Sequence, residues 1–148
     1  MTKALNNEDR IYLVRSYHEK ALESLNDARD LLELKPGLSA RMAYEAAYHF
    51  TVALFVSEGI LVPKTHRGLN SGLYQTFVDK ELFPRDIAAY LGQLEKDRNT
   101  AQYNPITKIQ AADAEKNLQK AGAFCDAMQK LVEKNLDELE KNEKGFSN

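Results

Sequence analysis

The apolar residues in the N-terminal part of the chain recur at alternating steps of three and four, the spacing of a helix in a bundle. This pattern predicts a first helix over residues 7–34, with an asparagine as cap and Glu8 and Asp9 in its first turn. Its apolar face comprises Ile11, Val14, His18, Ala21, Leu25, Ala28 and Leu32. We interpret His18, which lies on that face, as a hydrogen-bonded core histidine rather than a catalyst.

The next segment is apolar on most of its surface, which predicts a helix in contact with several neighbours. We expect it to begin at Ser39, whose hydroxyl can cap a helix, and to close at Gly59. Its alanines would let other helices approach closely; they are Ala43, Ala46, Ala47 and Ala53. This helix should therefore be the central one.

One polar stripe interrupts the second helix. Arg41, Glu45 and His49 follow one another at steps of four, and Tyr44 and Tyr48 flank them. Two interpretations remain open. The stripe is either a solvent-exposed strip with a Glu45 pair inside the helix, or part of a binding surface.

Three further helices are predicted. Thr65 can cap a short helix that carries Leu69, Leu73 and Phe77, and Pro84 fits the first turn of the next, which must stop before Pro105. A long helix over residues 107–141 follows, and its seam comprises Leu118, Ala121, Cys125, Met128, Val132 and Leu139. Asn135 interrupts that seam, so this helix could pack on its own bundle or on a second copy of the chain.

These elements predict an all-α fold, an up-and-down antiparallel bundle of four main helices plus a short one. The length fits one domain over residues 1–148, with a core at about 8–140 and a polar, frayed tail at 141–148. No segment shows the alternating pattern of a strand.

Composition excludes several classes of function. The net charge of −2 argues against bulk electrostatic attraction to nucleic acid, so any anion must bind a local cluster. There is no apolar run of membrane-spanning length and no signal peptide, and the single Cys125 fits a reducing compartment and a place in the core, so we expect a cytoplasmic protein. The three histidines form no metal-ligand pattern, and neither metal nor cofactor is expected.

One charged residue falls on an apolar face. Ile87, Leu91 and Leu94 recur at steps of four and three, and the next step falls on Arg98. A guanidinium cannot lose its charge, so an inward-pointing arginine must pair with a carboxylate or line a cleft that receives an anion.

Arg98 also opens a motif, Arg98-Asn99-Thr100-Ala101-Gln102-Tyr103. It resembles the signature of the HEPN superfamily, compact helical domains in which an arginine and an adjacent polar residue are followed by a histidine. Here Tyr103 takes the histidine position, as in a branch of small stand-alone HEPN proteins. The resemblance covers about residues 10–104, and the upstream segments that carry it are 42–50, 58–60 and 64–68.

The resemblance implies a homodimer that brings both arginine motifs to a shared cleft and cleaves RNA without a metal. Arginine would hold the scissile phosphate, and histidine would move the proton of the attacking 2′-hydroxyl. Tyr103 is a poor general base at neutral pH, although it can donate a hydrogen bond or stack on a base.

His66 is the candidate to replace the missing histidine, within a basic cluster at a helix start; the alternative for residues 64–68 is a solvated loop. The predicted catalytic residues are therefore Arg98, Tyr103 and His66, and the predicted ligand-binding residues are Asn99, Lys64, Arg67, Tyr44, Tyr48 and His49.

We accordingly predict a HEPN module that binds RNA or nucleotide and works in a pair with a nucleotidyltransferase, as in toxin and antitoxin systems. Two alternatives stay open: a metal-independent ribonuclease that uses Arg98, and a purely structural homodimeric interaction protein.

Overall fold

The structure is a computed structural model that describes residues 5–146, and helices form all the regular secondary structure of that range. The elements are α1 (Asn7–Leu31), α2 (Pro36–Ser57), α3 (His66–Leu73), the π-helix η1 (Tyr74–Val78), α4 (Arg85–Tyr103) and α5 (Ala111–Phe146). The prediction of an all-α bundle is confirmed.

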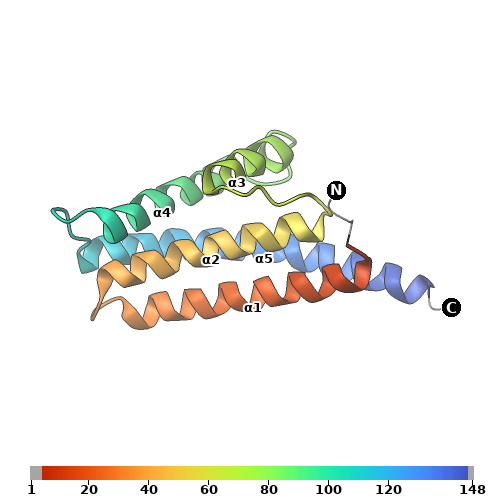
Figure 1. Ribbon diagram of the computed structural model, residues 1–148, viewed down its shortest axis with the longest axis horizontal. Helices are drawn as coiled ribbons and strands as arrows, with labels where there is room; N and C mark the ends of the chain where they lie inside the picture. Colours follow the sequence, from red (N-terminus) through yellow and green to blue (C-terminus); the bar gives the residue numbers. More distant parts are fainter. Residues whose placement is uncertain (1–4, 147–148) are drawn as a thin grey trace.

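The four long helices run alternately up and down (Figure 1). Helix α2 packs against α1, α4 and α5, and α5 also contacts both α1 and α4. Between α2 and α3, the chain runs back along α2 before α3 begins (Figure 1). This return places the start of α3 beside the first half of α2 rather than beyond its end.

Helix α2 is the central helix, as predicted. Every residue from 51 to 57 is buried, and the four alanines of the sequence prediction are all 0–1% exposed. Phe50 and Phe55 fill the space between α2 and its neighbours. The half-buried residues of α2 all lie between Pro36 and His49, and they include the polar stripe Arg41, Glu45 and His49.

The predicted turn between the first two helices is wrong in detail. Helix α1 ends at Leu31, and α2 begins at Pro36, a position where the missing N–H of proline has no helical partner to lose. Ser39 therefore does not cap α2. It is buried, and its hydroxyl donates instead to the Ala28 carbonyl oxygen across the turn, at 2.6 Å.

The other end of the α1–α2 pair is held by an arginine. Arg10 Nε donates to the Val56 carbonyl oxygen at 3.2 Å, and Arg10 Nη2 donates to the Ser57 carbonyl oxygen at 2.7 Å. These acceptors belong to the last turn of α2, where carbonyl groups lack helical partners. Gly59 then turns the chain with a φ of 71°, a conformation that favours glycine.

The predicted cap of α3 is confirmed. Thr65 Oγ1 accepts a hydrogen bond from the Gly68 N–H at 2.9 Å. A Cβ atom at position 68 would lie 2.9 Å from that same oxygen, so the cap requires a glycine there. The cap fixes His66 as the first residue of α3, and the predicted apolar residues Leu69, Leu73 and Phe77 are buried.

The last two helices differ from prediction at their ends. Helix α4 stops at Tyr103 before Pro105, as predicted, but Pro84 precedes the helix instead of lying in its first turn. Asn104 Oδ1 accepts from the N–H groups of Ile106 and Thr107, which forms a turn where the fifth helix was expected to begin. Helix α5 starts at Ala111 and continues to Phe146, so residues 141–146 are helical rather than frayed.

Helix α5 packs on its own bundle. Asn135 is buried, and its side-chain amide donates to Ser57 Oγ at 3.0 Å and to Glu58 Oε1 at 2.7 Å. The polar interruption of the seam thus joins α5 to the end of α2 in the same chain, and it fixes how these two helices meet.

Replacing Asn135 by alanine should lower the free energy of unfolding by about 1–3 kcal/mol, because the buried Ser57 hydroxyl and the Glu58 carboxylate lose their donor. Urea denaturation followed by circular dichroism measures this. Lys134→Ala, an exposed neighbour on α5, is the control and should change stability little. Equal stability of the two variants would show that the amide does not join the helices.

Candidate functional site

Arg98 lies where α2, α3 and α4 meet. Its guanidinium carbon is 5.1 Å from the centre of the Tyr44 ring, a cation–π distance, and its Nη2 is 3.3 Å from His66 Nε2. Nη1 donates to Asn99 Oδ1 at 2.8 Å. The structure therefore brings together Arg98, His66, Asn99 and Tyr44 from the predicted set.

Arg98 has no carboxylate partner in the part of the chain that the structure describes. No aspartate or glutamate oxygen there lies within 4.0 Å of its guanidinium. The sequence left two possibilities for Arg98, a carboxylate partner or a cleft that receives an anion. The described residues supply no carboxylate partner. A half-buried arginine that keeps its charge is suited to an anion.

The contact between Arg98 and His66 assigns the tautomer of the imidazole. A guanidinium only donates, so His66 Nε2 can accept from it only while that nitrogen carries a lone pair. In the neutral ring the proton is then on Nδ1, which lies 2.5 Å from the Tyr44 hydroxyl oxygen and donates to it. Tyr44 therefore orients His66 so that the basic nitrogen faces Arg98.

Tyr44 contacts His66 and Arg98 from the protein interior and has almost no surface exposed to a ligand. It is 1% exposed, and burial raises the pKa of its phenol well above the ordinary value, with a further contribution from the Glu95 carboxylate. The phenol stays neutral at every physiological pH. It was predicted as a ligand-binding residue, and its burial places it behind His66 and Arg98.

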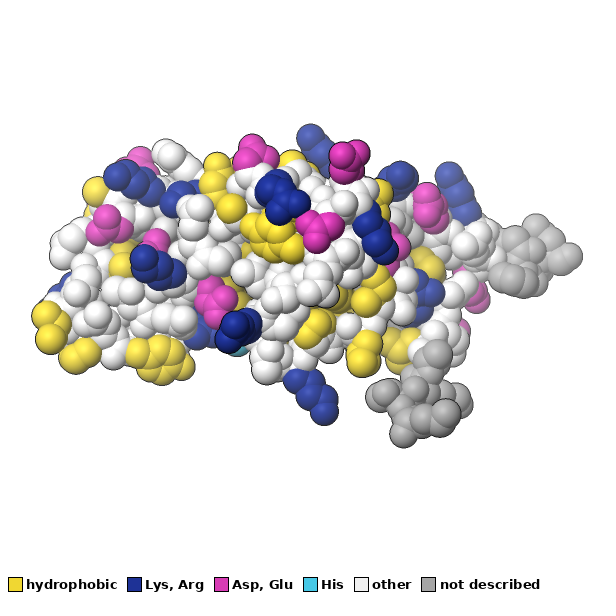
Figure 2. All heavy atoms as spheres, turned by 90° about the horizontal axis from the view of Figure 1, so that it is seen from above, with side chains coloured by type: hydrophobic (Ala, Val, Ile, Leu, Met, Phe, Trp, Pro, Cys, Tyr) yellow, Lys and Arg dark blue, Asp and Glu magenta, His cyan; other side chains and the backbone are white. Residues whose placement is uncertain are grey.

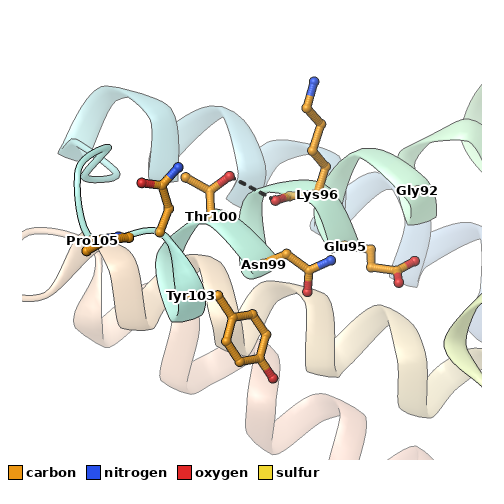
Figure 3. Close-up of a pocket in the computed structure, with 8 residues that line it drawn as sticks. Gly92, Glu95, Lys96, Asn99, Thr100, Tyr103 and Pro105 are labelled. Atoms are coloured by element: carbon orange, nitrogen blue, oxygen red, sulfur yellow. Dashed lines mark hydrogen bonds between the residues drawn. The ribbon is translucent and has the colours of Figure 1, made fainter.

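Tyr103 is not brought to His66. It is 68% exposed at the end of α4 and lines a shallow hollow of about 700 Å³ with Asn99, while Arg98 lies outside that hollow. Figure 3 shows Tyr103 and Lys96 projecting from α4 in opposite directions. Asn99, which lines the hollow and accepts from Arg98, is the link between the two places.

Tyr48 and His49 continue the site along α2. The Tyr48 ring lies 4.9 Å from the His66 ring and 5.4 Å from the His49 ring. His49 Nδ1 is 3.9 Å from Glu45 Oε2, a long contact, and burial lowers the pKa of His49 more than this carboxylate raises it. Glu45 and His49 therefore lie close together inside the helix, as one interpretation expected, but His49 Nδ1 has no hydrogen-bond partner among the described residues, and the stripe is only partly open to solvent.

Lys64 and Arg67 flank His66 at the start of α3, and both are exposed. Neither makes an ion pair or a side-chain hydrogen bond within residues 5–146. Their role in ligand binding stays a prediction, and both charged groups are accessible from solvent.

The chain as a whole has no large excess of either charge, since its net charge is −2. Figure 2 shows acidic and basic side chains interspersed over the face seen from above. Anion binding must therefore depend on the local geometry at Arg98.

Among the residues placed by the structure, no group of three or more histidine, cysteine, aspartate or glutamate side chains could hold a metal ion. Within the same range, no helix is long and apolar enough to cross a membrane.

Two other sequence predictions have outcomes in the core. Cys125 is buried as predicted, and burial raises the pKa of its thiol to about 12, so it is not a nucleophile at neutral pH. His18 packs its ring 5.2 Å from that of Phe50, but its Nε2 has no hydrogen-bond partner among the described residues.

Comparison with known proteins identifies one family and one relative that this chain resembles. The family model of the HEPN domain matches residues 14–132, a span that includes every predicted site residue. A protein of Thermotoga maritima named UPF0332 protein is similar to this chain, with 25% identity over 130 residues that cover 87% of this chain and 96% of the relative.

The buried Tyr44 phenol predicts a loss of stability at alkaline pH. The pKa of this phenol is higher in the folded protein than the unfolded value of about 10. Its contribution to the free energy of unfolding is therefore complete below pH 10 and is lost as the pH rises toward the folded pKa, because only the unfolded chain then releases the proton. From pH 10 upward, the free energy of unfolding should fall by up to about 1.4 kcal/mol per pH unit more in the wild type than in Tyr44→Phe. Urea denaturation at a series of pH values tests this, with the exposed Tyr12→Phe as a control that keeps the wild-type slope.

Proposed function

The chain belongs to the HEPN family, and we propose that it binds RNA or nucleotides through a phosphate held by Arg98. The observation that carries this proposal is the half-buried guanidinium without a carboxylate partner, described above. Phosphate groups match the planar donors of arginine and can replace the weak contact to His66. Asn99 fixes one side of the guanidinium, so its remaining donors point to a defined place.

Electrostatics favours a specific phosphate over a diffuse nucleic-acid surface. The net charge is −2, and no other arginine of the described chain combines half-burial with a histidine on one side and an aromatic face below. Arg85, which also lies over a tyrosine ring, is exposed and paired with Asp79 at 2.8 Å. The same helix thus holds a paired and an unpaired arginine.

Arg98→Ala should weaken binding of a short single-stranded RNA at least about tenfold, because charge-assisted hydrogen bonds to the phosphate are lost. The slope of log K against log salt should fall by about 0.7, the value for one phosphate contact on a single strand. Fluorescence anisotropy at several salt concentrations measures both. Arg85→Ala is the matched control on the same helix. Equal effects of the two substitutions would overturn the proposal.

The site also supports a second candidate, metal-independent cleavage of RNA. Nε2 of neutral His66 carries a lone pair and lies 3.3 Å from the atom that would hold the phosphate. It could accept the proton of a ribose 2′-hydroxyl while the 2′-oxygen attacks phosphorus and the 5′-oxygen leaves. The products would be a 2′,3′-cyclic phosphate and a 5′-hydroxyl, the latter after protonation of the leaving oxygen.

If the protein cleaves RNA, His66→Ala should lower the rate by about 10²-fold or more, the usual contribution of a general base. Tyr103→Phe should leave the rate near that of the wild type, since the phenol is exposed and makes no hydrogen bond or ring contact with His66. Cleavage of a labelled RNA in EDTA, with identification of the cyclic product, measures this. Binding that depends on Arg98 without any cleavage by the wild type would leave a binding module and exclude the ribonuclease.

Partners and compartment are further proposals. The family resemblance favours a homodimer and a nucleotidyltransferase partner, and the single buried cysteine fits a cytoplasmic protein. Light scattering of the purified chain tests the first: a monomer at micromolar concentration would oppose it. Co-purification with a nucleotidyltransferase encoded beside it tests the second.

A further inference from the structure

A continuous row of rings leads away from Arg98 across three helices. It consists of Tyr17 on α1, His49 and Tyr48 on α2, and His66 on α3, and we name it the aromatic strip. The ring centres are 6.1 Å apart from Tyr17 to His49, 5.4 Å from His49 to Tyr48, and 4.9 Å from Tyr48 to His66. All four residues are half-buried, so the rings pack on one another while part of each reaches the surface.

The two central residues of the strip, Tyr48 and His49, are uncharged near neutral pH. Burial raises the pKa of the Tyr48 phenol, with smaller contributions from Tyr17 and Glu45, so the phenol keeps its proton. Burial lowers the pKa of His49 below its ordinary value, against the effect of Glu45, so the imidazole is neutral. Neutral aromatic rings do not repel bases and can stack on them.

One cationic group lies at an end of the strip, and another lies near an inner ring. At the α4 end, His66 contacts the Arg98 guanidinium. The exposed Lys20 ammonium on α1 is near enough to His49 to lower its pKa further. Cations beside a row of rings suit a backbone whose phosphates alternate with bases.

We propose that the aromatic strip stacks the unpaired bases of a single-stranded RNA whose phosphate is held by Arg98. This inference rests on the proposed function and names its substrate class. Several rings extend farther than one base, so the strip favours an oligonucleotide over a mononucleotide. Bases inside a duplex are already stacked on one another and offer no free face to the protein, so paired RNA should bind weakly.

Tyr103 offers a competing place for a base, but its surroundings are less suited. The hollow that it lines contains the Glu95 carboxylate, as the strip has Glu45 beside it, but Lys96 of the hollow points away from Tyr103 (Figure 3). No other ring of the described residues packs on Tyr103 within the ring contacts of this structure.

The test compares probes with and without bases. Tyr17→Leu removes the ring farthest from Arg98 while it keeps apolar bulk, and Tyr12→Leu, an exposed tyrosine of the same helix, is the matched control. The probes are a single-stranded RNA with 2-aminopurine, an abasic oligomer of equal length, and the RNA paired with its complement. Because the chain has no tryptophan, the 2-aminopurine emission has little protein background.

Tyr17→Leu should weaken the single-stranded RNA about tenfold and leave the abasic oligomer unchanged, whereas Tyr12→Leu should change neither. The wild type should quench 2-aminopurine and should prefer the single strand to the duplex. Circular dichroism and thermal denaturation establish that each variant is folded.

The outcomes separate this inference from the proposed function. If Arg98→Ala leaves all binding intact, the proposed phosphate site fails. If Arg98→Ala weakens binding and folded Tyr17→Leu binds the RNA like the wild type, the inference that the aromatic strip stacks bases is wrong. A loss seen only in Tyr103→Leu would place the base in the hollow instead. A Tyr17→Leu variant that dissociates a dimer without changing RNA affinity would identify the strip as an interface between two copies, and it would also overturn the inference.

Discussion

The enclosure of α2 is the constraint on which the rest of the structure depends. A helix buried over all of residues 51–57 has no side to turn toward water, so α1, α4 and α5 must surround it. Its alanines allow that close approach. Only toward its N-terminal half does the enclosure open, and there α3 begins. The candidate site lies at this opening, because it is the one stretch where side chains of the central helix meet three other helices and solvent together.

The charge of Arg98 then determines which ligands that opening can bind. Arg98 reaches it from α4 with a charge that cannot be removed, and the neighbours it meets are a phenol, an imidazole and an amide, none of which is a carboxylate. Neutral acceptors orient a guanidinium without cancelling its charge. The Glu95 carboxylate influences Tyr44 but is not within ion-pair distance of Arg98. An arginine without a carboxylate partner can attract an anion locally. Such a site does not require a basic surface, which the overall composition does not provide.

Sequence patterns predicted the helices and the core because both follow from the spacing of apolar residues, and the inward register of Arg98 came from the same rule. They were wrong about Ser39, since a serine near a helix start can cap it or, as here, donate across the turn to Ala28. The place of His66 beside Arg98 was expected from a family resemblance, not from periodicity. Tyr17 was not predicted at all. Its contact with His49 depends on how α1 crosses α2, and no one-dimensional pattern contains that angle.

The position of the histidine has a consequence for how the site is assembled. In the motif that this chain resembles, the histidine follows the arginine within a few residues, so the local chain largely fixes their separation. Here Tyr103 stands in the histidine position, and the imidazole beside Arg98 comes from α3. Its placement therefore depends on tertiary structure: the Thr65 cap that requires Gly68, and the packing of α3 along α2. In our proposal, Arg98 on α4 provides the affinity for phosphate, whereas any proton transfer depends on how the packing of α3 places His66. In our proposal, binding and cleavage thus depend on different helices, because Arg98 lies on α4 and His66 on α3.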